Sequence, residues 1–482
     1  MIAPTDTTRA NRLSRAAYAA RTGREETTPP VRIVHLGLGA FHRAHQAWYT
    51  HQVDETNEWG IAAFTGRNPQ AALELQPQDG LFTVVERAES GDSATIVTSI
   101  VEAVDGADLT RLRELLAAPT TSIVTLTVTE AGYRLTVDGL PNLGDSDVAA
   151  DVAWLRAAFS AAVLPDAAEH GPTTTLGRLL LGFEARRRAN GGPIAVVPCD
   201  NIPDNGAFVA QGLGALARLV NSSTADWIDA EVSFVSTSVD RITPRTTAAD
   251  LETAAALTGW NDEAAVVTEP FRDWVLSGRF PAGRPAWDRA GALFVEEIEP
   301  FERRKLWMLN GAHSILAYAG LLRGHATVAE AMADLVCRDW VNTWWDSVVN
   351  HLPAEELALG DYRAALLARF DNARIEHQLA QISGEAVTKL RVRIVPTVLA
   401  ERAAGRDALA GLRAIGSWAA LVIGGYALVD ADSASVAQAT GADDVVERLV
   451  TLIDPRLSAD DTVLAAIRGV VESASKAGAP VA

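Results

Sequence analysis

Three residues with chemically useful side chains lie within an otherwise apolar, helix-like run. Residues 299–318 contain Lys305, Asn310 and His313 among leucine, alanine and aromatic residues. A lysine held beside apolar surface can lose its proton near neutral pH and then act as a base. In an ideal α-helix these three residues and Glu302 fall within roughly a 140° sector. One helix face would therefore present a base, an amide donor and an imidazole to a cleft.

Each of these residues also has an ordinary structural interpretation. Lys305 alone could be a lysine that snorkels along an amphipathic helix. Glu302 could form a surface ion pair with it at i,i+3 spacing, or it could relay the proton to water. Asn310 and His313 could be core residues with satisfied hydrogen bonds. The coincidence of all of them on one face favours the chemical interpretation.

A glycine-rich turn supplies a redox partner for this lysine. A β-rich run at residues 31–36 is closed by Gly37-Leu38-Gly39 and followed by a helical pattern to about residue 53. In the dinucleotide fingerprint the glycines permit the tight turn and the approach of the pyrophosphate to the helix N-terminus. His42 replaces the third glycine, so a purely structural turn stays an alternative. The predicted NAD-binding residues are Leu36, Gly37, Leu38, Gly39, Ala40, Phe41, His42 and Arg43.

The second strand of this unit ends near residue 65 and is followed by Arg67. The acidic residue that grips the ribose 2′-hydroxyl of NAD is not found there. Arg67 could meet the 2′-phosphate of NADP, or it could be a solvated loop cation. Arg67 does not decide between the two cofactors; we expect NAD, with NADP not excluded.

Two further polar residues follow apolar strands. Asn201 comes after the run at residues 193–198, and Asp240 comes after the run at residues 232–238. Residues just beyond the strand ends of such sheets line the ligand crevice, although each could also be a turn former or a helix cap. A second amide at Asn201 would complete a pair of donors for a developing alkoxide.

Composition excludes several classes of function. The net charge of −19 argues against nucleic acid or an anionic membrane as the main partner. Two cysteines and no HExxH pattern leave no basis for a zinc site or a disulfide framework. No apolar run reaches the roughly 20 residues of a membrane span. We expect a cytoplasmic monomer or small homo-oligomer that acts on a small molecule and uses no metal.

The order of elements predicts an α/β fold with two domains. Strand-like runs at residues 31–36, 60–65, 81–86, 96–101, 122–129, 193–198 and 232–238 alternate with helical segments such as 109–116 and 147–161. From residue 299 onward helical patterns dominate, among them 326–350, 373–382 and 409–428. We expect a weakly ordered lead-in at 1–30 with a short helix at 13–21, a Rossmann-type domain with a largely parallel sheet at 31–290, and a mainly α-helical domain at 291–482.

Several of these segments together resemble the polyol-specific long-chain dehydrogenase/reductase family, also called the mannitol dehydrogenase family. The matching stretches cover residues 33–46, 126–133, 199–206, 239–244, 269–275, 305–313 and 369–372. The resemblance implies metal-independent hydride transfer with NAD(P). It also implies that Lys305 is the general base, that Asn201 and Asn310 stabilise the oxyanion, that Glu302 conducts the proton, and that His313, Asp240 and Lys389 contact the substrate.

The substrate loop is where the chain departs from its relatives. Mannitol dehydrogenases carry an arginine eight residues before the lysine that corresponds to Lys389, whereas this chain has Gln381 there, as fructuronate reductases do. An Asp-Gly-Ser sequence common to both subfamilies is replaced by Glu385-Ala386-Val387. We expect D-mannonate/D-fructuronate as the substrate pair. The alternatives are D-mannitol/D-fructose, another polyol such as arabinitol, or a non-catalytic nucleotide-sensing regulator on the same fold.

Overall fold

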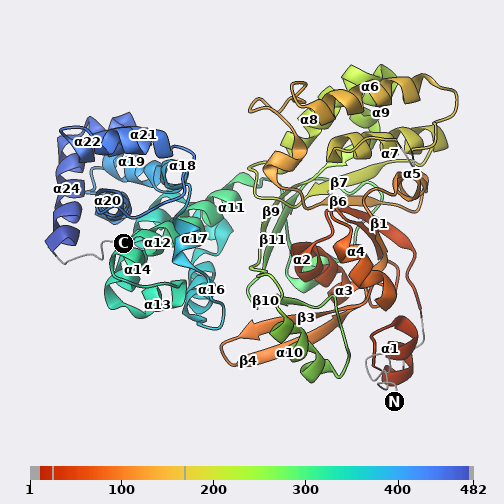
Figure 1. Cartoon of the computed structure of the whole chain (residues 1–482), viewed down its shortest axis with the longest axis horizontal. Coiled ribbons are helices and arrows are strands. Elements are labelled where there is room, and N and C mark those ends of the chain that lie inside the picture. Colours follow the sequence, from red (N-terminus) through yellow and green to blue (C-terminus); the bar gives the residue numbers. More distant parts are fainter. Residues whose placement is uncertain (1–10, 24–26, 168–169, 477–482) are drawn as a thin grey trace, which may run out of the picture. The chain divides into compact units, whose positions relative to one another are not determined.

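The computed structural model describes residues 11–23, 27–167 and 170–476 (Figure 1). It divides into two compact units, one ending at Ile298 and the other beginning at Glu299. Each unit has its own core and is described separately. The helix predicted near residues 13–21 is present as α1 (Arg15–Thr22), whereas residues 1–10 and 24–26 of the predicted lead-in lie outside the described residues.

The first unit is built on a six-stranded parallel sheet. The strand order is β5-β2-β1-β6-β7-β8, and every neighbouring pair is parallel. Counted by their sequence within this sheet alone, the strands lie in the order 3-2-1-4-5-6, which is that of dinucleotide-binding folds. The prediction of a Rossmann-type domain is therefore confirmed. The strand bounds are Val31–Leu36 (β1), Gly60–Phe64 (β2), Ile100–Val104 (β5), Ile123–Leu126 (β6), Ile194–Pro198 (β7) and Val232–Phe234 (β8).

Helices cover both faces of this sheet (Figure 1). Successive side chains of β1 point to opposite faces, so Val34 and Leu36 belong to one apolar core and Ile33 to the other. The first core packs under α5 to α9, and the second packs under the helical segment that follows β1. The α-helices of the first unit after α1 are α2 (Ala40–His42), α3 (Trp48–Val53), α4 (Gln70–Leu75), α5 (Leu109–Ala117), α6 (Ser146–Ser160), α7 (Thr175–Ala189), α8 (Asn205–Val220), α9 (Ser222–Glu231) and α10 (Ala248–Thr258), of which α10 packs on β3 and β4.

Two three-stranded sheets complete the first unit. One contains β10 (Val266–Thr268), β3 (Phe82–Ala88) and β4 (Gly91–Val97), and the other contains β12 (Leu293–Val295), β11 (Asp273–Ser277) and β9 (Ser236–Asp240). Two sequence predictions were wrong here. The strand predicted at 96–101 is the end of β4 and the start of β5, and the strand predicted at 232–238 is β8 followed by β9. Each pair of strands belongs to different sheets, and that assignment depends on partners remote in sequence.

The second unit is helical in the described residues 299–476, as predicted, and every residue from Gly311 to Leu321 of its central helix α12 is buried. The helix predicted at 373–382 is wrong, because only Leu379–Ser383 is helical there and Gln378 forms a β-bridge with Thr327. The helices are α11 (Glu299–Arg304), the π-helix η5 (Lys305–Asn310), α12 (Gly311–Leu322), α13 (Val328–Ala333), α14 (Leu335–Val348), α15 (Ala354–Leu357), α16 (Leu359–Asp371), α17 (Leu379–Ser383), α18 (Ala386–Arg393), α19 (Val395–Ala403), α20 (Leu409–Ile423), α21 (Ser433–Thr440), α22 (Val445–Ile453), α23 (Pro455–Ser458) and α24 (Asp461–Lys476).

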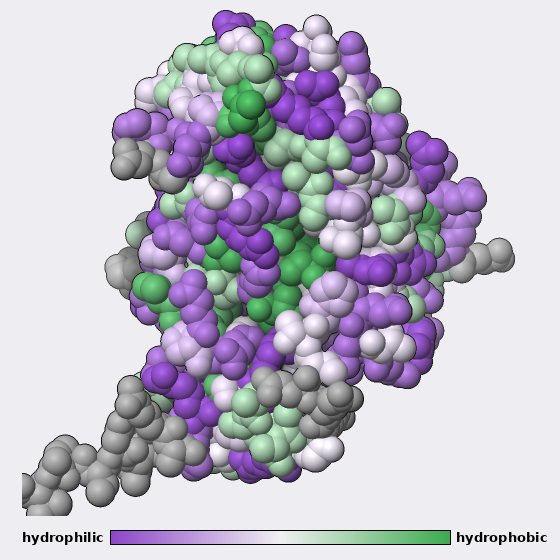
Figure 2. All heavy atoms as spheres, turned by 90° about the vertical axis from the view of Figure 1, so that its right-hand side faces the viewer, coloured by the Kyte–Doolittle hydropathy of each residue, from purple (hydrophilic) through white to green (hydrophobic). Residues whose placement is uncertain are grey.

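Among the described residues, no helix is both long enough and apolar enough to cross a membrane. The face shown in Figure 2 is covered mainly by hydrophilic residues, with a smaller hydrophobic area near its centre.

Candidate active site

A cavity of about 870 Å³ opens at the carboxyl edge of the parallel sheet. It is lined by residues at the carboxyl ends of four adjacent strands: Leu36 and Gly37 at the end of β1, Thr65 to Arg67 after β2, Asp105 to Ala107 after β5, and Thr127 to Thr129 after β6. Ligands of open α/β sheets bind at this edge, where the strand order reverses. The position and the lining therefore fit a dinucleotide.

The two glycines of the turn are required for different reasons. Gly37 has φ +113°, and a Cβ placed on it would lie 2.3 Å from the carbonyl oxygen of Thr127, so the protein itself excludes any side chain there. A Cβ on Gly39 would come no closer than 3.6 Å to the nearest protein atom, the Gly37 carbonyl oxygen. The protein thus leaves room beside Gly39, which is compatible with the approach of a pyrophosphate to the backbone.

The glycine turn is supported by hydrogen bonds that involve Thr127 and a histidine of β1. The Thr127 hydroxyl donates to the carbonyl oxygen of Gly37 at 2.8 Å, and it lies 3.1 Å from Nε2 of His35 on β1. The other ring nitrogen of His35 lies 2.8 Å from the Thr125 hydroxyl. The shape of the glycine turn therefore depends on side chains of two neighbouring strands.

His42, which replaces the third glycine of the fingerprint, packs flat against His35. The ring centroids are 3.3 Å apart and the planes differ by 8°. The third glycine normally permits close packing of helix on strand, and here ring stacking provides that contact. The helix continues as a π-helix, η1 (Arg43–Ala47). Burial lowers the pKa of His35 to about 3 and that of His42 well below its usual value, so both rings are neutral.

The predicted cofactor residues thus fall into two groups. Leu36, Gly37 and Arg67 line the cavity. Leu38, His42 and Arg43 are buried, and the Arg43 guanidinium donates to the carbonyl oxygens of Gly39 and Ala264. Ala40 and Phe41 pack against the second core. Arg67 is exposed and forms no ion pair within the described part of the chain.

The loop that carries Asn201 is fixed on both sides of that residue. Asp200 accepts a hydrogen bond of 2.5 Å from the Tyr133 hydroxyl. The Asn205 side chain donates to the carbonyl oxygens of Asp200 and Thr237, and its own oxygen accepts from the Thr237 amide. Asn201 itself is exposed at the carboxyl end of β7. Asn205 has a supporting role that strand-end reasoning did not identify.

Asp240 is the last residue of β9 and is half-buried. It lies opposite Asp273 in the antiparallel β9–β11 ladder. The next residue, Arg241, is buried and donates to the carbonyl oxygens of Ala44 and Glu269 and to the Glu86 carboxylate. Arg241 therefore ties the end of β9 to the π-helix η1 and to β3, which fixes the backbone that bears Asp240.

In the second unit, Lys305 and Asn310 are the first and last residues of the π-helix η5. Hydrogen bonds in a π-helix span five residues rather than four, so each turn is wider than in an α-helix. The angular sector calculated for an ideal α-helix is therefore wrong across these residues. The wider turn places positions five residues apart, such as 305 and 310, closer to the same side of the helix. Single π-turns of this kind occur frequently at functional sites.

Side chains from elsewhere in this unit satisfy carbonyl groups of the π-helix. The indole Nε1 of Trp344 donates to the carbonyl oxygen of Trp307 at 2.8 Å, and that of Trp345 donates to Met308 at 2.9 Å. The carbonyl oxygen of Asn310 lies 3.3 Å from a guanidinium nitrogen of Arg393. The π-turn is thus held in place by donors on α14 and α18.

His313 lies one turn beyond Asn310 and is 7% exposed. Its ring contacts Phe370 and stands at right angles to His377, with centroids 4.9 and 5.0 Å away. Its Nε2 has no hydrogen-bond partner within residues 11–23, 27–167 and 170–476. Burial holds the pKa of His313 well below its usual value, and the nearby cations and His377 lower it further.

The substrate loop of the prediction forms α17, α18 and the residues between them. Gln381 is exposed on α17, and Lys389 lies on α18 with its Nζ 2.9 Å from the carbonyl oxygen of Ile382. Glu385 adopts a left-handed conformation at φ +53°, and its amide donates to Val429. The Val387 amide donates to Asp430. Residues 429–431 therefore hold the loop that joins Gln381 to Lys389.

Two other polar sites lie outside the regions described above. His325, Asp334 and Cys337 lie close enough to hold a metal ion, but Asp334 already accepts hydrogen bonds from Arg323, His325 and the Val336 amide.

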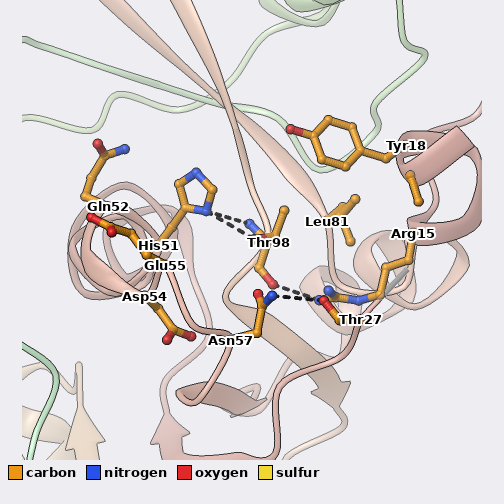
Figure 3. Close-up of a pocket in the computed structure, with 11 residues that line it drawn as sticks. Arg15, Tyr18, Thr27, His51, Gln52, Asp54, Glu55, Asn57, Leu81 and Thr98 are labelled. Atoms are coloured by element: carbon orange, nitrogen blue, oxygen red, sulfur yellow. Dashed lines mark hydrogen bonds between the residues drawn. The ribbon is translucent and has the colours of Figure 1, made fainter. Parts of the chain in front are cut away.

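Figure 3 shows a second cavity, of about 580 Å³, beside α1. Its hydrogen bonds join His51 to Thr98 and Asn57 to Thr27.

The residues of this second cavity identify its place on the sheet. Thr27, Asn57 and Thr98 precede β1, β2 and β5, so they mark the amino edge of the parallel sheet. That edge is opposite to the one at which ligands of this architecture bind. We therefore assign no part of the chemistry to this cavity.

Comparison with known proteins identifies relatives of both units. A family model for the mannitol dehydrogenase Rossmann domain matches residues 31–289, and one for the mannitol dehydrogenase C-terminal domain matches residues 297–449. The D-mannonate oxidoreductase of Escherichia coli (strain K12) is 34% identical over 380 residues, covering 76% of this chain and 75% of that protein. The D-arabinitol 4-dehydrogenase of Ralstonia nicotianae is 34% identical over 391 residues, covering 78% and 80%.

A solved structure is similar over nearly the whole length. It is that of Pseudomonas fluorescens mannitol 2-dehydrogenase in a ternary complex with NAD and D-mannitol, with a TM-score of 0.75 and 30% sequence identity. The match covers 94% of this chain and 93% of that one.

Proposed function

The chain belongs to the mannitol dehydrogenase family of NAD-dependent polyol and sugar-acid oxidoreductases, and we propose that its substrate pair is D-mannonate and D-fructuronate. The observation that carries this choice is the set of cationic side chains around His313, since a sugar acid has a carboxylate and a polyol has none. Gln381, in place of the arginine of mannitol dehydrogenases, supports the same choice. D-Mannitol/D-fructose is the second candidate and D-arabinitol the third.

The reaction requires a base and donors for an oxyanion. We propose that neutral Lys305 accepts the proton of the substrate's secondary hydroxyl group, and that the side chains of Asn201 and Asn310 donate to the developing alkoxide. In the reductive direction protonated Lys305 returns the proton to the same oxygen. Bound NAD supplies the hydride acceptor for the carbon centre. Glu302, one turn before Lys305 along the chain, carries the proton between the lysine and water.

The π-turn supports the roles of Lys305 and Asn310. Both residues lie at its ends, and donors on α14 and α18 hold its carbonyl groups. A base and an oxyanion donor must be held within a fraction of an ångström of the productive geometry. A turn whose carbonyl groups are held by other helices meets that need better than an exposed loop would.

Replacing Lys305 by Ala tests the mechanism. We expect turnover to fall by at least about 1000-fold, since general base and proton donor are lost together, while the Kd for NADH stays within about twofold. Lys476 on α24 is a matched control, because Lys476→Ala removes the same charge from a helix assigned no role. A Lys305→Ala enzyme that keeps near-wild-type rates across the pH range would disprove the mechanism.

Substrate choice is tested by a panel. Reduction of D-fructuronate, D-tagaturonate, D-fructose and D-xylulose is measured, each with NADH and with NADPH. We expect the highest kcat/KM for D-fructuronate. Higher values for the uncharged ketoses would move the assignment to D-mannitol or D-arabinitol, and NADH binding without turnover of any compound would favour a nucleotide-sensing role.

A further inference from the structure

Two like charges lie one helical turn apart on α18. Lys389 and Arg393 have i,i+4 spacing, and both side chains are half-buried. Like charges at this spacing destabilise a helix, and the cost rises when the charges are removed from water. An anion bound between the two cations would offset this cost.

Within the described part of the chain, neither Lys389 nor Arg393 forms an ion pair with a carboxylate. One terminal nitrogen of the Arg393 guanidinium lies 3.3 Å from the Asn310 carbonyl oxygen and 3.4 Å from the Ser314 hydroxyl. Lys389 donates to the carbonyl oxygen of Ile382. Both side chains therefore retain donors, because a guanidinium has five N–H groups and an ammonium has three.

The acidic residues that act on Lys389 accept hydrogen bonds from backbone amides. Glu385 accepts from the Ala431 amide at 3.0 Å, and Asp430 accepts from the amides of Val387 and Asp432. These two carboxylates raise the pKa of Lys389, but burial and Arg393 outweigh them and lower it to about 8.

His313 adds an independent observation. Its Nε2 is buried and has no hydrogen-bond partner among the residues that the structure describes. The ionisable groups that lower the pKa of His313 electrostatically are His377, Arg369, Arg393 and Lys389, and none of these can carry a negative charge. A buried imidazole without a partner, set among cations, indicates a place for a polar anionic ligand rather than a packed core.

We propose that Lys389 and Arg393 bind the terminal carboxylate of the substrate, which makes the chain selective for sugar acids over uncharged polyols. Arg393 extends the set of proposed substrate contacts, and the inference rests on the proposed function because it concerns the same site. A guanidinium offers a planar pair of donors that matches a carboxylate, and the ammonium adds a point charge. A phosphate ester would offer related chemistry, and the test separates the two.

The experiment compares D-fructuronate with D-fructose, which has a hydroxymethyl group in place of the carboxylate, and with D-fructose 6-phosphate. We expect the kcat/KM of the wild type to be highest for D-fructuronate. The ratio of kcat/KM for D-fructuronate to that for D-fructose should fall about 10- to 100-fold in Arg393→Met and in Lys389→Met, mainly through KM, because each loses a hydrogen bond to a charged group. Arg393→Lys should restore part of the ratio. Arg448→Met is the control, since Arg448 is an exposed arginine on α22.

A binding measurement separates this inference from the proposed reaction. In the Lys305→Ala background, D-mannonate should bind more tightly than D-mannitol in the presence of NAD, and Arg393→Met should remove the difference. Equal losses for D-fructuronate and D-fructose in Arg393→Met would assign Arg393 only to the support of Asn310 and overturn the proposal. A preference for D-fructose 6-phosphate, or for D-fructose, would overturn it as well while leaving an active oxidoreductase.

Discussion

The indole nitrogen of Trp344 donates to the carbonyl oxygen of Trp307 over 2.8 Å, and this bond joins α14 to the middle of the π-helix that carries Lys305 and Asn310. The contact is possible because residue 311 is glycine, since a Cβ there would lie 2.7 Å from the same indole nitrogen. The register of the two proposed catalytic side chains therefore depends on a tryptophan that does not belong to their helix.

Trp344→Phe keeps most of the apolar surface but removes the donor. The Trp307 carbonyl is then left without that partner, which costs about 1–3 kcal/mol of stability. We expect kcat to fall about tenfold or more with a smaller change in the Kd for NADH, because a small displacement of catalytic groups has a large effect on rate. Chemical denaturation and steady-state kinetics measure the two effects. Trp340→Phe on the same helix is the control, and an equal loss of kcat there would argue against a specific role for Trp344.

The two glycines of the cofactor turn are expected to respond differently to alanine. In Gly37→Ala the new Cβ meets the Thr127 carbonyl in a left-handed backbone conformation, so we expect a loss of stability of about 2 kcal/mol or more. In Gly39→Ala the protein has room for the methyl group, so the melting temperature should stay near that of the wild type while NADH binds at least about tenfold more weakly. Differential scanning fluorimetry and NADH titration distinguish the two. Tight NADH binding by Gly39→Ala would place the pyrophosphate elsewhere.

The strand, the glycine turn and the helical second unit could be predicted because their signals are local. β-Branched and apolar runs mark β1, and Gly37 and Gly39 mark the turn within a few residues. The π-helix could not be predicted from the same kind of signal. Its donors, Trp344 and Trp345, lie 37 residues away from the carbonyl groups they satisfy, so an ideal α-helix was assumed in its place.

Residues that support the site were also harder to find than residues that perform chemistry. Lys305, Asn310 and Asn201 have side chains whose function can be inferred from type and position. Arg241 and Asn205 act by bonding to main-chain carbonyls of distant segments, and such partners are known only once the chain is folded. Arg393 is an intermediate case, because its i,i+4 spacing from Lys389 is visible in the sequence while its position beside Asn310 is not.

The stacked pair of His35 and His42 predicts a pH dependence of stability. Burial holds the pKa of His42 well below 6.5 in the folded protein, so between that value and pH 6.5 the unfolded chain binds a proton that the folded chain does not. The free energy of unfolding therefore falls as the pH drops below 6.5. His42→Phe should lessen the loss of stability between pH 7.5 and pH 5, since phenylalanine binds no proton in either the folded or the unfolded chain.

Urea denaturation of the wild type and of His42→Phe at the two pH values measures this effect. His170→Phe is the control, because His170 is exposed and its replacement should leave the wild-type pH dependence. An unchanged pH dependence in His42→Phe would mean that His42 is protonated in the folded protein.

The charge at the end of β2 predicts how the cofactor affinity responds to substitution. Arg67 lines the cavity, and the first acidic residue after β2 is Glu74. Arg67→Glu introduces a carboxylate where the ribose 2′-position is recognised in this fold. We expect the Kd for NADPH to rise at least about tenfold, because the 2′-phosphate is repelled, while the Kd for NADH changes about threefold or less. Fluorescence titration with both nucleotides gives the ratio. Equal changes for NADH and NADPH would show that the 2′-position lies away from Arg67, next to another residue of the cavity such as Asp105.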